Sequence, residues 1–167
     1  MNNIILKKGL FGSIIVSALL IFITAYMKAN PEKEVSMMIG FAGMLLAFFF
    51  VVTGIKQQRE ANNGSISLGK GFLTGFWITL IISTIYVIVW LIIFYNFFPN
   101  FAEHYTDMAI AKASPDEVAQ VTEDMNSFKE MYKSPIMVIL LTYMEILPLG
   151  IVFSFVSALI LKKKQIN

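Results

Sequence analysis

Residues 72–98 read FLTGFWITLIISTIYVIVWLIIFYNFF and contain no charged side chain. A helix of roughly 20 apolar residues crosses the hydrocarbon core of a bilayer, so this stretch is long enough to span a membrane. Residues 10–27, 35–55 and 135–161 have the same character, and of these only the last contains a charged residue, Glu145. Irregular backbone cannot face lipid, so each stretch is expected to form a spanning helix. The sequence therefore predicts an all-α integral membrane protein, a four-helix bundle that forms a single domain.

The composition supports this class of protein. Hydrophobic residues make up 57% of the chain and charged residues 14%, whereas charged residues average about 25% in soluble domains. The chain has no cysteine, which excludes disulfides, thiolate nucleophiles and Cys-ligated metals. Lys7 and Lys8 precede the first apolar run as in a signal sequence, but Ala25 and Ala29 are too far apart to form a cleavage motif. We therefore expect an uncleaved signal anchor.

Charged residues are distributed unequally between the two sides of the predicted bundle. The N-terminus, the connection between spans two and three and the C-terminus share one side and hold most of the basic residues. These are Lys7, Lys8, Lys56, Arg59, Lys70, Lys162, Lys163 and Lys164. The same side has one acidic residue, Glu60, and most other acids lie in the opposite connections. The positive-inside rule then predicts that both termini are cytoplasmic.

The segment GSISLGKG, residues 64–71, resembles a phosphate-binding loop, G-x-x-x-x-G-K-[ST], except that Gly71 replaces the hydroxyl residue. Such a loop follows a buried strand of an α/β domain, whereas here a polar run follows a membrane span. We therefore expect no bound nucleotide. A turn at residues 62–64 is expected instead, with Lys70 at the level of the lipid headgroups, where a cation meets anionic lipid.

Small residues recur at intervals of four in three of the spans. They are Gly9, Ser13 and Ser17 in span one, Gly71, Gly75, Thr79 and Ser83 in span three, and Gly150 and Ser154 in span four. Residues four apart share a helix face, and small side chains allow membrane helices to approach closely. We interpret these faces as helix-packing surfaces, although small residues are also common in membrane helices without such a role.

Glu145 is ten residues from Pro135, about 15 Å along a helix and therefore near the middle of span four. An acidic residue at this depth costs about 2.5–3.5 kcal/mol, which makes it a candidate functional residue. No cation lies in any span, so burial favours the neutral carboxyl group. Three hydroxyl groups are expected near it. Ser17 and Tyr86 are predicted at a similar depth, and Thr142 lies on the same helix face.

Pro148 follows Glu145 and cannot donate a hydrogen bond to the carbonyl of Met144, so a kink is expected there. Broken helices of this kind form ion and substrate sites in transporters. Two interpretations of Glu145 remain open. It is either a neutral, hydrogen-bonded residue that fixes how the helices pack, or a site for a proton or ligand.

Residues 99–134 are predicted to form an extracytoplasmic amphipathic helical hairpin between spans three and four. Ser114, Pro115 and Glu117 form a helix-start signal for its second arm. The apolar seam comprises Val118, Val121, Met125, Phe128 and Tyr132 on the second arm, with Phe101, Tyr105 and Met108 on the first. The seam can pack on the other arm, the bundle, the membrane surface or a partner.

Known catalytic arrangements are not evident in the sequence. His104 is near Glu103 and Asp107, but single-His clusters on exposed helices are usually solvated, so no metal site is expected. Neither a Ser–His–Asp set nor a catalytic pair of carboxylates is present. We expect a protein that is not an enzyme, has no cofactor and does not bind nucleic acid.

Two parts of the sequence, ISLGKGF…IYVIVWLI…FPNF and FKEMYKSP…EILPLG…SALILKKK, resemble a bacterial family of four-span membrane proteins of unknown function, domain of unknown function 4199. The resemblance covers nearly the whole chain. Its clearest parts are the entry to span three at Gly69–Lys70 and the region from Glu145 to Pro148. It implies a four-span protein of a bacterial inner membrane and supplies no reaction, ligand or partner.

These observations support two hypotheses of function. In the first, the chain is a non-enzymatic accessory, scaffold or assembly protein that associates with itself or with another membrane protein. Its contacts would be the hairpin seam (Tyr105, Val118, Val121, Met125, Phe128 and Tyr132) and the small-residue faces. The alternative is a small proton- or solute-coupled transporter that uses Glu145.

Overall fold

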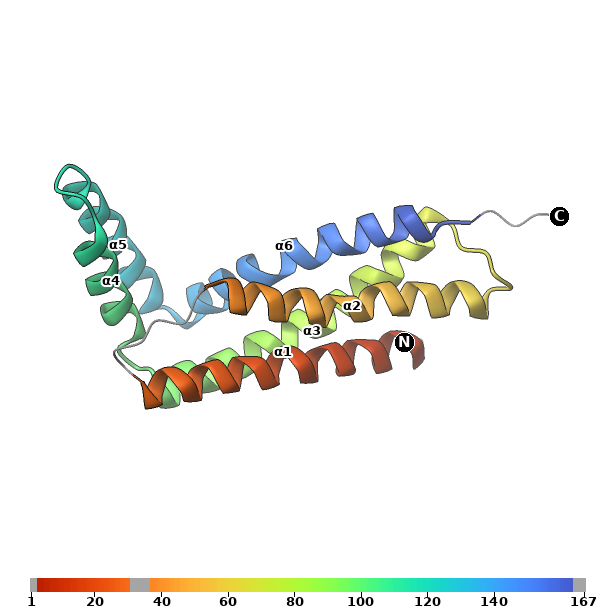
Figure 1. The fold of residues 1–167 in the computed structure, drawn as a ribbon, viewed down its shortest axis with the longest axis horizontal. Helices are drawn as coiled ribbons and strands as arrows, with labels where there is room; N and C mark the ends of the chain where they lie inside the picture. The colour runs from red at the N-terminus through yellow and green to blue at the C-terminus, as the bar shows by residue number, and fades with distance from the viewer. Residues whose placement is uncertain (1–2, 31–36, 164–167) are drawn as a thin grey trace. The chain divides into compact units, whose positions relative to one another are not determined.

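The computed structural model describes residues 3–30 and 37–163, which are largely helical. Within these described ranges, six helices follow one another (Figure 1): α1 (Asn3–Ala29), α2 (Met37–Ala61), α3 (Leu68–Phe97), α4 (Phe101–Lys112), α5 (Val118–Tyr132) and α6 (Pro135–Leu161). The β-structure in the described ranges is an isolated antiparallel bridge between Ile66 and Lys163. The prediction of an all-α fold, with a helical hairpin between the third and fourth long helices, is confirmed.

Four helices, α1, α2, α3 and α6, are long and apolar enough to cross a membrane. Their ends differ from the predicted spans, because α1 already begins at Asn3, α2 continues to Ala61 and α3 begins at Leu68. Lysine and glutamine are good helix formers, so a helix can continue past its apolar run into polar sequence. The predicted start of span two at residue 35 lies outside the described residues.

The chain divides into two compact units. The first comprises Met1–Val89 and Tyr143–Asn167, and the second comprises Trp90–Thr142. The first unit therefore contains α1, α2 and the adjoining parts of α3 and α6. The second contains α4 and α5 with the remaining turns of α3 and α6.

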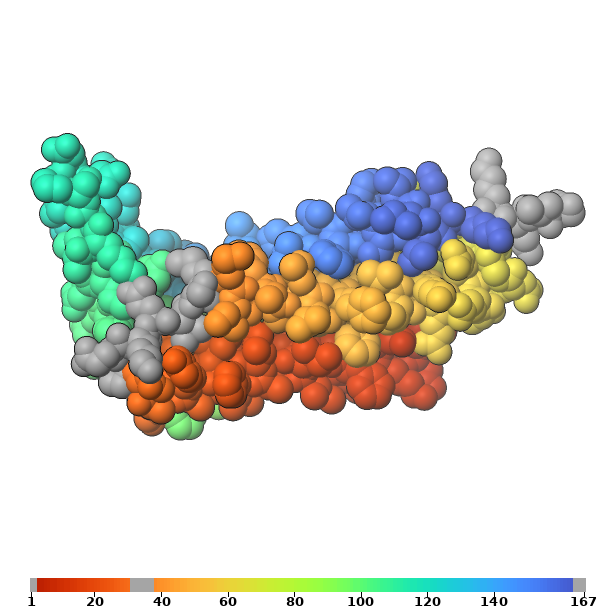
Figure 2. All heavy atoms as spheres, in the orientation of Figure 1, coloured from red at the N-terminus to blue at the C-terminus, as the bar shows by residue number. Residues whose placement is uncertain are grey.

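The core of the first unit is centred on one face of α2. Ala47, Phe48, Val51 and Ile55 are fully buried there, at the spacing of a single helix face. Residues from the other three helices pack around this face, and Figure 2 shows α2 between α1 and α6 on the side in view. They include Val16, Ile78, Ile82, Ile146 and Ala158. The opposite faces expose large apolar side chains such as Phe22, which is 66% exposed, as expected of helices that contact lipid.

The hairpin in the second unit turns at residues 113–117, and α5 begins at Val118 rather than at the predicted start signal. Only part of the expected capping box is present. The carboxylate of Glu117 accepts hydrogen bonds from the Ser114 hydroxyl (2.6 Å) and backbone N–H (3.4 Å). The hydroxyl donates to the carboxylate and is therefore not the acceptor that would cap the helix.

The two hydrogen bonds to Glu117 lead to a testable prediction about how the stability of the turn depends on pH. The Ser114 hydroxyl, followed by its N–H, lowers the pKa of Glu117 below the usual value of 4.5. A group with a lowered pKa stabilises the folded state above its unfolded pKa and loses that contribution as the pH falls through the folded value. We expect the turn to loosen in this acidic range, and Glu117→Gln to remove this component of the pH dependence. An NMR titration midpoint for Glu117 at or above 4.5 would contradict the prediction.

Candidate functional site

The contact between α3 and α6 in the first unit is built from the small residues noted in the sequence. A methyl group added to Gly71 would lie 3.2 Å from the Cβ atom of Ala158, and one added to Gly75 would lie 2.9 Å from that of Ser154. A methyl group on Gly150 would lie 2.6 Å from the Phe48 ring and would also meet Thr79. Gly75 and Gly150 therefore occupy places where a neighbouring helix leaves no room for a larger side chain, and Gly71 lies at a close contact where its neighbour would have to shift slightly.

Thr79 links α3 to α6 by hydrogen bonds at this contact. Its hydroxyl donates to the carbonyl of Gly150 (3.1 Å) and lies 3.0 Å from the hydroxyl of Ser154. Ser154 donates to the same carbonyl at 2.7 Å. Both hydroxyl residues are fully buried, so these bonds satisfy polar groups that have no access to solvent. Thr79 belongs to the four-residue stripe of α3, but its hydrogen bonds were not foreseen from the sequence.

The small residues of α1 differ in their surroundings: Gly9 and Gly12 pack closely on other helices, whereas the Ser17 hydroxyl is buried without a hydrogen-bond partner among the described residues. A methyl group on Gly9 would lie 2.7 Å from Ile81, and the Ser13 hydroxyl donates to the Gly9 carbonyl at 2.7 Å. Gly12, which is outside the noted stripe, also packs closely, since a methyl group there would lie 3.0 Å from the Ala47 carbonyl oxygen. The Ser17 hydroxyl oxygen is buried and has no hydrogen-bond partner among the described residues.

Glu145 lies on the exposed surface of α6 and not inside the first unit. Its carboxyl group accepts a hydrogen bond from the phenol of Tyr86, with 3.4 Å between the oxygen atoms. Tyr86 itself is buried, at 6% exposure, so the phenol reaches outward from the core to the carboxyl group. A separation of 3.4 Å is long for a bond between two oxygen atoms, so this single contact leaves most of the carboxyl group without a partner from the described chain.

The other two residues predicted near Glu145 form no hydrogen bond with it. The hydroxyl of Thr142 donates to the Val138 carbonyl at 2.7 Å, within its own helix, and Ser17 is unpartnered as described above. A further α3–α6 hydrogen bond near Glu145 was not predicted. The phenol of Tyr143 donates to the Thr84 hydroxyl at 2.9 Å. The sequence contained one signal for this contact, because Tyr143 lies two residues before Glu145 and Thr84 lies two residues before Tyr86.

Pro148 does not interrupt α6, which is one continuous helix from Pro135 to Leu161. α6 is therefore not broken at Pro148 in the way that helices are broken at the ion and substrate sites of transporters. The polar groups near the middle of α6 in the first unit are the carboxyl group of Glu145 and the phenol of Tyr143, each hydrogen-bonded to α3. This pair of contacts can fix the register of the two helices. The exposed carboxyl group can also accept or donate a hydrogen bond to a neighbouring molecule.

The apolar seam of the hairpin packs mainly within the second unit. The ring of Phe128 lies 4.4 Å from that of Tyr132 and 5.3 Å from that of Tyr105, measured between centroids. Phe101 stacks on Tyr105 at 6.0 Å, and Phe94 at the end of α3 lies 5.6 Å from Tyr132. The seam thus joins α4 to α5 and to the last turns of α3, and a foreign partner would have to compete with these contacts.

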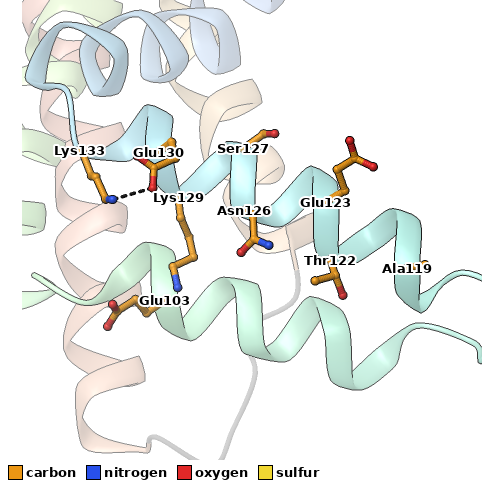
Figure 3. A pocket seen from close by; sticks show the side chains of 9 residues that line it. All are labelled: Glu103, Ala119, Thr122, Glu123, Asn126, Ser127, Lys129, Glu130 and Lys133. Atoms are coloured by element: carbon orange, nitrogen blue, oxygen red, sulfur yellow. Dashed lines mark hydrogen bonds and ion pairs between the residues drawn. The ribbon is translucent and has the colours of Figure 1, made fainter.

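The polar side of the hairpin surrounds a shallow cavity of about 660 Å³. Figure 3 shows Lys129 extending from α5 toward α4, where Glu103 lies, while Asn126 and Thr122 line the wall. Lys133 and Glu130 form an exposed ion pair at 2.6 Å, a type that contributes little to stability. Within the described ranges, no group of three or more His, Asp or Glu side chains is placed to hold a metal ion.

Residues 64–67 of the segment GSISLGKG connect α2 to α3, and residues 68–71 form the first turn of α3. A helix, α2, therefore precedes the segment in place of the strand that precedes a nucleotide-binding loop. A second cavity, of about 750 Å³, is lined by residues of this segment, by Asn62 and by Lys162 and Lys163, which follow α6. Neither this cavity nor the one on the hairpin is lined by Glu145.

The described residues define a multi-pass membrane protein, with four helices long and apolar enough to span a membrane and a helical hairpin between the last two. The chain belongs to the family described as protein of unknown function (DUF4199), whose model matches residues 7–163. No match is found among curated proteins or solved structures.

Proposed function

We propose that this chain is a non-enzymatic accessory or scaffold protein that binds another membrane-spanning chain, either a different protein or a second copy of itself. The observation that carries the proposal is the position of Glu145 on the exposed surface of an apolar helix. A polar group at the centre of a membrane is costly when it faces lipid. A partner helix that covers Glu145 and offers a hydrogen bond would offset this cost.

The surroundings of Glu145 favour a protein contact over a transport path. The neighbouring side chain of Met144 is 71% exposed, so this part of α6 presents an open surface to the membrane. In the core of the first unit, the hydroxyls of Thr79, Ser154 and Ser13 are engaged by carbonyls or by each other. A transporter requires polar groups along an internal route. These three hydroxyls are committed to helix packing, whereas the buried hydroxyls of Ser17 and Ser83 have no partner among the described residues and form no continuous chain of hydrogen bonds with them.

We further propose that the chain lies in a bacterial cytoplasmic membrane with both termini in the cytoplasm. The distribution of lysine and arginine along the sequence supports this orientation. The hairpin would then lie on the extracytoplasmic side, with its polar cavity, lined by residues such as Glu123 and Asn126.

The experiment that tests this proposal is photo-crosslinking in cells from position 144, compared between the parent chain and Glu145 variants. We expect one defined membrane protein, or a second copy of the chain, to be captured. Glu145→Leu should reduce its yield about threefold to thirtyfold, because one polar contact between membrane helices contributes about 0.6–2 kcal/mol. Glu145→Gln should retain most of the yield, because an amide can also hydrogen-bond.

A matched control separates partner binding from internal packing. Tyr86→Phe removes the internal hydrogen bond to Glu145 and leaves the carboxyl group in place, so it should leave capture unchanged. Equal losses in Tyr86→Phe and Glu145→Leu would indicate a structural role and contradict the proposal. Proton flux in liposomes that requires Glu145, without specific capture, would favour the alternative of a transporter.

A further inference from the structure

The second cavity lies where α2 and α6 end and α3 begins. Two separate chain segments contribute to it, residues 62–70 and the two lysines that follow α6. Its polar lining consists of Asn62, Ser65, Ser67, Lys70, Lys162 and Lys163. The volume of about 750 Å³ is sufficient for a lipid headgroup with part of its glycerol.

The local backbone holds these segments in a defined arrangement. Asn63 and Gly64 have positive φ angles of 54° and 77°, which reverse the chain directly after α2. Ile66 and Lys163 then exchange two backbone hydrogen bonds of 3.0 Å, which fasten the loop to the end of α6. The guanidinium of Arg59 adds a hydrogen bond to the Leu161 carbonyl at 3.3 Å. The cavity is therefore assembled by contacts distant in sequence and does not depend on one flexible loop.

The residues that line the cavity carry a net positive charge, because they include three lysines and no acidic residue. Lys70, Lys162 and Lys163 are all exposed, and no carboxylate is among the residues that line the cavity. The ammonium group of Lys70 donates to the neutral side-chain oxygen of Asn62 at 3.2 Å. The serine hydroxyls and the Asn62 amide add polar groups without adding charge. This combination is suited to an anion that presents several acceptor oxygen atoms.

The position of the cavity indicates the source of that anion. It lies at the ends of three apolar spanning helices, which is the level of the headgroups on that side of the membrane. Ile66, which is 2% exposed, contributes an apolar residue beside the lysines. We propose that this cavity binds the phosphate group of an anionic phospholipid. This assignment gives Lys70 a ligand other than a nucleotide, and it is independent of any protein partner.

Native mass spectrometry of the purified full-length protein in detergent tests the proposal. The probes are short-chain phosphatidylglycerol, phosphatidylcholine of the same acyl length, and inorganic phosphate. The cavity variant Lys70→Gln/Lys163→Gln is compared with Lys7→Gln/Lys56→Gln, which removes two exposed lysines outside the cavity. Circular dichroism establishes that both variants keep their helices.

We expect the parent to bind phosphatidylglycerol in preference to phosphatidylcholine, and the cavity variant to bind it roughly thirtyfold more weakly. This estimate takes about fivefold for each lysine that attracts an anionic lipid. The variant outside the cavity should lose less than about threefold. Equal losses in the two variants would indicate diffuse attraction and overturn the proposal. Tight binding of inorganic phosphate to the lipid-free protein, with displacement of the lipid, would overturn the assignment to a lipid headgroup.

Discussion

Gly150→Ala is expected to lower the free energy of unfolding of the four-helix part of the chain by about 1–3 kcal/mol, the usual cost of overpacking a filled core. The added methyl group would lie 2.6 Å from the buried ring of Phe48 and would also meet Thr79. Both neighbours are fully buried, and a threonine side chain is restricted in its rotamers, so neither can move aside easily. The change would also disturb the hydrogen bond from Thr79 to the Gly150 carbonyl.

The same chain provides a matched control for this prediction. No neighbouring atom lies within 4 Å of a methyl group added to Gly40, which is also within a helix. Gly40→Ala should therefore leave stability unchanged or raise it slightly, because alanine is the better helix former. Unfolding of the detergent-solubilised protein, followed by circular dichroism during titration with a denaturing detergent, measures both variants. Equal stability of Gly150→Ala and the parent would show that the contact is looser than described.

The small-residue stripes illustrate how much of the packing can be predicted from sequence. Spacing by four identified Gly71, Gly75 and Gly150, and the structure places all three against a neighbouring helix. Spacing could not identify their partners, because it describes one helix at a time and the pairing depends on how the helices are arranged. Thus Gly9 packs on Ile81, a large residue, and not on the small-residue stripe of another span.

The orientation of Glu145 could not be predicted, for a physical reason. α6 is apolar on all sides, so its sequence has no polar face that would distinguish the side facing lipid from the side facing the bundle. In the structure, Ile146 is fully buried, whereas Met144 and Glu145 lie on the exposed surface. Only the packing of the helices therefore shows which side of α6 faces the bundle. The hairpin presents the opposite case, because α5 alternates apolar and polar residues with a helical period and its inward face is evident from sequence.

The ends of the helices were the least predictable feature of the fold. Hydropathy locates the part of a helix that crosses the hydrocarbon, whereas the helix itself continues until a breaking residue or turn. α2 therefore runs through Lys56 and Arg59 and ends only before the turn at residues 62–64. This extension brings Arg59 to the Leu161 carbonyl and places Asn62 beside Lys70, two contacts that hydropathy alone does not indicate.

Phe128→Ala is expected to open the helical hairpin while leaving the four long helices intact. None of the described residues of α5 is fully buried, and α5 packs on α4 through half-buried aromatic contacts and a long hydrogen bond from Thr106 to the Met125 carbonyl. Phe128 contacts both Tyr132 and Tyr105, with centroid distances of 4.4 and 5.3 Å. Removing a fully buried phenylalanine side chain costs about 1.5–3 kcal/mol in lost apolar burial. Each aromatic pair contributes about 0.5–1.5 kcal/mol more. Allowing for partial burial, the hairpin should lose about 2 kcal/mol.

Ser127→Ala is the matched control, because the adjacent serine lies on the exposed polar side of α5 and its loss removes no seam contact. Hydrogen exchange of the backbone amides measures both variants. A loss of about 2 kcal/mol should speed exchange in α4 and α5 roughly thirtyfold in Phe128→Ala, since local opening rather than global unfolding exposes these amides. Exchange in the buried turns of α2 around Val51 should not change, because that core belongs to the other unit. Faster exchange in α2 as well would mean that the hairpin and the four-helix core open as one cooperative structure, which the division into two units does not anticipate.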